Sequence, residues 1–157
     1  MISSTHLHAM LIHFPIALLI IGFFSELTGI IFKKTFFNQA SFYLLILGTF
    51  GIIASYLSGD AAGEGMEDGA LGKAIGMHEE AAFISLWIAI ATALVYSTIV
   101  LFKYSNKWIK FIGVLMFAAL IGGVSRTAYL GGQLVYKHGA GVELSLPDFN
   151  ETDSTSY

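Results

Sequence analysis

The chain has 157 residues, of which 55% are hydrophobic and only 12% are charged. Domains that fold in water carry about 25% charged residues, so this composition indicates a protein whose main solvent is lipid. A net charge of -3 excludes the basic surface that nucleic-acid-binding proteins need. The absence of cysteine excludes structural disulfides, thiolate zinc sites, iron–sulfur clusters and covalently attached haem.

Four apolar runs follow one another, each long enough to cross a hydrocarbon core of about 30 Å. They predict an all-α fold, an integral membrane four-helix bundle, over residues 1–146. The predicted helices cover about residues 7–32, 40–58, 78–102 and 109–136. The first run lacks a basic start and a small-residue cleavage site, so we expect it to be retained as a span. Residues 147–157 form an acidic tail with too little apolar surface to fold alone.

The connections between the runs differ in charge. Lys33 and Lys34 in the first connection, and Lys103 and Lys107 in the third, predict that both face the cytoplasm, because basic loops are retained there. The second connection, residues 59–76, is acidic and glycine-rich, and we expect it to be a flexible outer loop. Both termini are therefore predicted on the outer, periplasmic side of an inner membrane.

All of the histidines fall toward the predicted outer side, and they are His6, His8, His13, His78 and His138. Each taken alone suits an interfacial imidazole bonded to a carbonyl or to water. Imidazole is also the usual ligand of haem iron, copper and zinc, so a histidine layer on three helices predicts a metal or haem site.

Pro15 follows His13 closely and either kinks that helix or marks its first turn. No internal repeat is evident, although the first and third runs both carry histidine at one end.

Small residues share the face of the third helix below His78, and they are Ala81, Ala82, Ser85, Ala89, Thr92 and Ala93. Such a stripe admits either a neighbouring helix or a flat macrocycle. Arg126 lies well inside the fourth run, where a charge is expected to face the interior with a partner. That partner is a haem propionate, a carboxylate or a helix carbonyl. For Glu26, a proton path, a bond to a neighbouring helix and a contact with another subunit all stay open.

Two segments carry a family resemblance. Residues 8–18 place His8 five residues before His13-Phe14-Pro15, and residues 131–142 run Gly-Gly-Gln-Leu-Val-Tyr-Lys-His-Gly-Ala-Gly-Val. With Gly59-Asp60 and His78, the chain resembles a bacterial membrane family known as domain of unknown function 2231. It departs from that family at Ala9, where proline is usual. The resemblance spans nearly the whole chain and implies four helices and a shared histidine layer, but no activity.

The leading hypothesis is a haem b-binding electron-transfer subunit with bis-histidine ligation near the outer membrane face. His13 and His78 are predicted as the axial ligands, His8 and His138 as alternates or hydrogen-bonding neighbours, and Arg126 as a cofactor-binding residue. Bis-histidine ligation suits electron transfer because it leaves no open position on the iron. Expected partners are the lipid bilayer, other membrane or periplasmic redox subunits, and a second copy of the chain.

Two alternatives use the same residues differently. The first is a copper or zinc ion held by the histidine layer, which comprises His8, His13, His78 and His138. The second is a cofactor-free structural subunit of a larger membrane complex. A stand-alone zinc hydrolase is disfavoured because His78-Glu79-Glu80 lacks the second histidine of a His-Glu-x-x-His helix. We therefore expect an electron-transfer or accessory subunit and not an enzyme acting by itself.

Overall fold

The computed structural model describes residues 4–63, 69–103 and 106–142, and these form long helices joined by short connections. The helices are α1 (Ser4–Phe32), α2 (Thr35–Gly63), α3 (Gly69–Leu101) and α4 (Lys107–His138). Each is long and apolar enough to cross a membrane. The prediction of an all-α protein with four spanning helices is confirmed, and the predicted tail over residues 147–157 lies outside the described residues.

Helices α2 and α3 extend into the segment that we expected to be an outer loop. Helix α2 continues to Gly63 and α3 begins at Gly69, so the prediction of a loop over residues 59–76 is wrong for most of its length. Glycine costs a helix interior only about 1 kcal/mol relative to alanine. The extended turns pack against neighbours, with Gly59 against His8 and Gly63 near Ile75, and this packing outweighs that cost.

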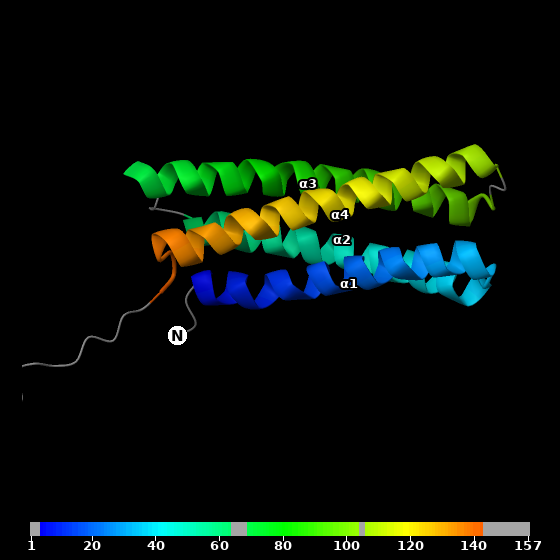
Figure 1. Cartoon of the computed structure of the whole chain (residues 1–157), viewed down its shortest axis with the longest axis horizontal. Coiled ribbons are helices and arrows are strands. Elements are labelled where there is room, and N and C mark those ends of the chain that lie inside the picture. The colour runs from blue at the N-terminus through cyan, green and yellow to red at the C-terminus, as the bar shows by residue number, and fades with distance from the viewer. Residues whose placement is uncertain (1–3, 64–68, 104–105, 143–157) are drawn as a thin grey trace, which may run out of the picture.

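The bundle consists of two helical hairpins, α1 with α2 and α3 with α4, as Figure 1 shows. Between the hairpins, α2 packs against α3, whereas α1 and α4 touch more sparsely. The start of α1 and the end of α4 lie at one end of the bundle, which we call the histidine end. The lysine-bearing turns between α1 and α2 and between α3 and α4 lie at the other, the lysine end (Figure 1).

The interior is filled by a small apolar core, and the outside is also apolar. Leu19, Leu45, Phe117 and Leu120 are fully buried, and the Phe117 ring meets the edge of Tyr96 with ring centroids 5.9 Å apart. Many large hydrophobic side chains are exposed on every helix. An exposed apolar surface of this extent indicates contact with lipid, since soluble monomers rarely expose large contiguous apolar patches.

The two hairpins repeat one structural pattern. When His8 is aligned with His78, the buried Leu19 of α1 falls opposite the buried Ala89 of α3. When Gly59 is aligned with Gly131, these pairs of α2 and α4 positions match: Ser41 with Gly113, Leu45 with Phe117, Gly48 with Leu120, and Gly51 with Gly123. Both hairpins also turn just after a lysine in the left-handed conformation, Lys33 at φ 52° and Lys103 at φ 51°. The two hairpins therefore bury matching positions, and we call this correspondence the two-fold relation.

Candidate functional site

A cavity of about 220 Å³ lies at the histidine end, lined by residues of all four helices. His8 of α1 and His78 of α3 both line it. Most of the remaining wall is apolar and includes Ile12, Ile75 and Leu134. The structure thus brings one histidine from each hairpin to a single apolar cavity.

The His8 ring is held by α2. Its Nδ1 lies 3.0 Å from Ser58 Oγ, and Ser58 Oγ donates its own hydrogen to the carbonyl of Ser55 at 3.0 Å. Because the serine hydrogen is already used, Nδ1–H of His8 donates to Ser58 Oγ. A methyl group at Gly59 would lie 2.9 Å from Cε1 of His8, so a glycine is needed where the ring packs on α2.

The His78 ring is held by α4 in the corresponding way. Its Nδ1 lies 3.1 Å from the carbonyl oxygen of Thr127, and a carbonyl can only accept, so Nδ1 carries the hydrogen. A methyl group at Gly131 would lie 3.1 Å from Cε1 of the ring. In the two-fold relation, Gly131 matches Gly59 and Thr127 matches Ser55, whose carbonyl also interacts with the His8 ring.

The same tautomer is therefore fixed on both rings. A neutral imidazole with its hydrogen on Nδ1 presents an unshared electron pair on Nε2. A hydrogen bond from the non-ligating nitrogen orients the ring and raises its basicity in metal proteins, and it is a regular accompaniment of histidine ligation. His8 and His78 thus have the hydrogen-bond arrangement of ligands that bind through Nε2.

The segment after α4 closes one side of the cavity. Gly139 ends α4 in the left-handed conformation at φ 66°, and its N–H donates to the carbonyl of Val135 at 3.0 Å. Ala140 and Gly141 then line the cavity. A side chain at Gly141 would collide with Thr5 near the start of α1, so the Gly-Ala-Gly sequence lets the chain return over the histidine end.

Three other predicted site residues lie elsewhere. His13 is exposed on α1, with Nδ1 2.7 Å from the carbonyl of Ala9 in its own helix. His138 is exposed at the end of α4. Arg126 is exposed on α4, so the expectation that it faces the interior is wrong. The sequence indicated its depth, but it held no signal for the side of the helix that it occupies.

Pro15 is buried inside α1, where a methyl group at Gly51 of α2 would lie 2.9 Å from its Cβ. Of the two positions considered for it, the helix interior is the one observed. His6 is exposed near the start of α1, away from the lining of the cavity.

Carboxylates also line the cavity, but they do not complete a cluster with the histidines. Asp60 and Glu79 both contribute to its wall. Among the described residues, no group of three or more His, Asp or Glu side chains is arranged to hold a metal ion. The described part of the site therefore offers two imidazoles and no third ligand beside them.

Sequence reasoning missed the residues that support the rings. These residues, Ser58, Gly59, Thr127 and Gly131, support a histidine on another helix. Ser58 lies 50 positions from His8 and Thr127 lies 49 positions from His78, so nothing in the local sequence links them. The available signal was the pairing of Gly59 on α2 with Gly131 on α4, which the alignment of the two hairpins shows.

These features define a class: a four-helix membrane protein with a half-buried pair of histidines at one end. The chain belongs to the family described as "Predicted membrane protein (DUF2231)", whose family model matches residues 4–144. No curated protein matches the chain, and no solved structure matches it either. The family resemblance noted in the sequence is confirmed, and the family description assigns membrane residence without an activity.

Proposed function

We propose that the protein is a haem b-binding electron-transfer subunit in which His8 and His78 ligate the iron. The observation that carries the proposal is the pair of imidazoles that line one cavity from separate hairpins, each with Nδ1 hydrogen-bonded and Nε2 available. His8 thereby replaces His13 as the first ligand, because His13 is exposed on the outside of α1. When bound, haem b supplies a one-electron couple whose two axial positions are filled.

The number of protein ligands favours haem over a bare ion. Structural zinc takes four protein ligands and type-1 copper takes three, whereas haem brings four nitrogen ligands and needs only two from the protein. The described cavity presents two histidines without a third ligand in a cluster. The two-fold relation also pairs these two residues, which suits a planar cofactor with the same ligand on each face.

The size of the cavity imposes a condition on this proposal. Its volume of about 220 Å³ is below the roughly 300–1,000 Å³ of pockets that enclose drug-sized ligands. A porphyrin fits only if the hairpins move apart, and the sparse contact between α1 and α4 is the place where this requires least loss of packing. Ser55 Oγ lines the same cavity, is buried, and makes no hydrogen bond in the described structure, so a polar group of a bound molecule can reach it.

The test is a reduced-minus-oxidised visible spectrum of the detergent-purified protein. We expect sharp α and Soret bands, and we expect His8→Ala and His78→Ala each to lower the haem content per protein at least tenfold. His13→Ala and His138→Ala are the matched controls and should keep the bands, because neither residue lines the cavity.

Two results would contradict the proposal. Full haem content in both His8→Ala and His78→Ala would remove these residues as ligands. A featureless spectrum of the wild-type protein would remove haem, and metal analysis would then decide between a copper or zinc site using His8, His78, Asp60 and Glu79 and a subunit without a cofactor.

A further inference from the structure

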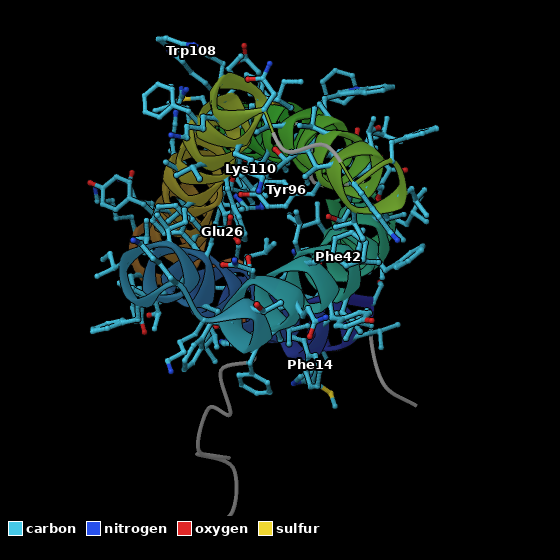
Figure 2. The ribbon with its side chains drawn as sticks, turned by 90° about the vertical axis from the view of Figure 1, so that its right-hand side faces the viewer. Phe14, Glu26, Phe42, Tyr96, Trp108 and Lys110 are labelled. Atoms are coloured by element: carbon cyan, nitrogen blue, oxygen red, sulfur yellow. The ribbon has the colours of Figure 1, made fainter. Side chains whose placement is uncertain are left out.

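A second cavity, of about 450 Å³, lies at the lysine end between the two hairpins. Figure 1 shows the hairpins diverging at this end, and Figure 2 looks along the bundle from there, with Glu26, Tyr96 and Lys110 close together in its centre. Phe42 of α2 and Ile30 of α1 also line the cavity. It is separated from the histidines by the buried apolar core, so it is a distinct site.

Oxygen atoms converge at the inner part of this cavity. Glu26 of α1 and Tyr96 of α3 line it, and Ser41 of α2 and Tyr96 both adjoin the Glu26 carboxyl group. Ser41 is 0% exposed and Tyr96 only 6%, yet Ser41 Oγ and Tyr96 Oη make no hydrogen bond of good geometry in the described structure. Buried hydroxyl groups are nearly always paired, and the Glu26 carboxyl group is the polar partner within reach of both.

Positive charges stand at the mouth of the same cavity. Two exposed lysines line it. Lys33 directly follows α1, and Lys110 lies in the first turn of α4. Lys110 is close enough to act electrostatically on Glu26. Thr35 and Asn38 add polar groups to the mouth. The cavity therefore has a carboxyl group at its inner part and lysine ammonium groups at its opening.

The two-fold relation shows that this polarity is specific to the lysine end. His8 and His78 are identical partners at the histidine end. Five helical turns further along, at 3.6 residues per turn, the matching positions are Glu26 and Tyr96, and on the second helices Asn38 matches Lys110. The lysine-end cavity is thus lined by unlike residues, which include one carboxyl group and two lysines.

We propose that this cavity binds a zwitterion in which a primary ammonium group is joined to a phosphate. The ammonium group has three N–H donors, and the carboxyl group of Glu26, which lines the cavity, is the acceptor that meets it. The phosphate meets Lys33 and Lys110, since lysine is a common phosphate-binding residue. Glu26 lies about 10 Å from Lys33 along α1 at 1.5 Å per residue, and flexible lysine side chains span the remainder of that distance.

The head group of phosphatidylethanolamine has this chemistry, and a lipid bilayer can supply it. Phosphoethanolamine dissolved in water has the same two groups. The proposal does not depend on haem, because no residue of the histidine-end cavity takes part in it.

The experiment is native mass spectrometry of the delipidated, detergent-purified full chain with three probes: dioleoylphosphatidylethanolamine, dioleoylphosphatidylcholine and free phosphoethanolamine. We expect the ethanolamine lipid to bind at least tenfold more tightly than the choline lipid, whose quaternary ammonium has no N–H donor. Glu26→Gln should weaken binding of the ethanolamine lipid at least tenfold, and Tyr96→Phe should weaken it less. Glu80→Gln, an exposed change at the histidine end, is the matched control and should bind as the wild type does.

Lys110→Ala is a second test at an exposed position, and it leaves Glu26, Ser41 and Tyr96 unchanged. It should also weaken binding of the ethanolamine lipid. Equal binding of the two lipids, or unchanged binding by both Glu26→Gln and Lys110→Ala, would overturn the proposal. If free phosphoethanolamine competes with the lipid at equal concentration, the zwitterion site stands and its ligand comes from water; if it does not compete, the lipid is the ligand.

Discussion

Two neighbouring glycines of α4 have different surroundings. A methyl group at Gly131 would lie 3.1 Å from Cε1 of His78, whereas one at Gly132 would meet nothing within 4 Å. The adjacent pair therefore separates the effect of ring position from the general effect of removing a helical glycine.

We predict that Gly131→Ala displaces the His78 ring and lowers haem content several-fold, while Gly132→Ala leaves it unchanged. Alanine raises helix stability by roughly 0.5–1 kcal/mol relative to glycine, so Gly132→Ala should keep or raise the melting temperature. The measurement is the Soret absorbance per protein together with thermal unfolding of each variant. Equal haem content in the two variants would show that the approach of α4 to the ring is not needed for binding.

For single residues, the sequence predicted which residue types form the site better than it predicted the side of the helix on which each side chain lies. His8 and His78 line one cavity, whereas the predicted pair of ligands was His13 and His78 with His8 as an alternate, and His13 and Arg126 are exposed. A helix that is apolar all round gives no polar face from which its rotation can be read. The small-residue face of α3 was predictable because Ala81, Ser85, Ala89 and Thr92 recur at helical spacing, and all of them are buried.

Within the first hairpin, glycines let α1 and α2 approach closely. A methyl group at Gly48 would lie 2.7 Å from both Cγ and Cδ2 of Leu19, which is 0% exposed. Leu19 is enclosed by the core and has little room to move. Small residues at such positions are a common feature of packed membrane helices.

We predict that Gly48→Ala destabilises the protein by about 1–3 kcal/mol, the usual cost of inserting an extra group into a packed interior. Gly76→Ala is the control, because a methyl group there meets nothing within 4 Å. Unfolding in mixed micelles of increasing dodecyl sulfate content, followed by circular dichroism, measures both variants. A Gly48→Ala protein as stable as the control would mean that α1 and α2 can separate at this level without cost.

The existence of each helix could be predicted from the length of its apolar run, but the ends could not. Gly59 and Gly63 were expected in the loop after the second helix, and both belong to α2. Their contacts with His8 and with residues of α3 form only in the folded bundle. Local composition carries no information about such contacts. The prediction of the helix ends therefore failed where contacts between helices stabilise a helical turn that its own residues disfavour.

For the molecule as a whole, the two ends differ in charge and are predicted to face opposite sides of the membrane, with the lysine end in the cytoplasm. The chain has no cysteine, so a single introduced cysteine reports one position. We predict that Lys34→Cys reacts with a membrane-impermeant maleimide only after the membrane is opened, whereas Lys137→Cys reacts in intact cells. Both lysines are exposed, one at each end of the bundle. Labelling in the reverse order would invert the predicted orientation and place the histidine cavity on the cytoplasmic side.

The repeated hairpin has a consequence for how such a protein can arise. Each hairpin crosses the membrane twice and returns to the side from which it started, so a second copy joined behind it inserts in the same orientation. Repeats of this parallel type are related by an axis along the membrane normal. Two identical hairpins, associated as separate chains before any gene fusion, would already have presented one histidine each to a shared axis at the same surface. If the repeated unit had an odd number of helices, the second copy would insert in the opposite orientation. Its histidine would then lie at the opposite face of the membrane, and no paired site could form.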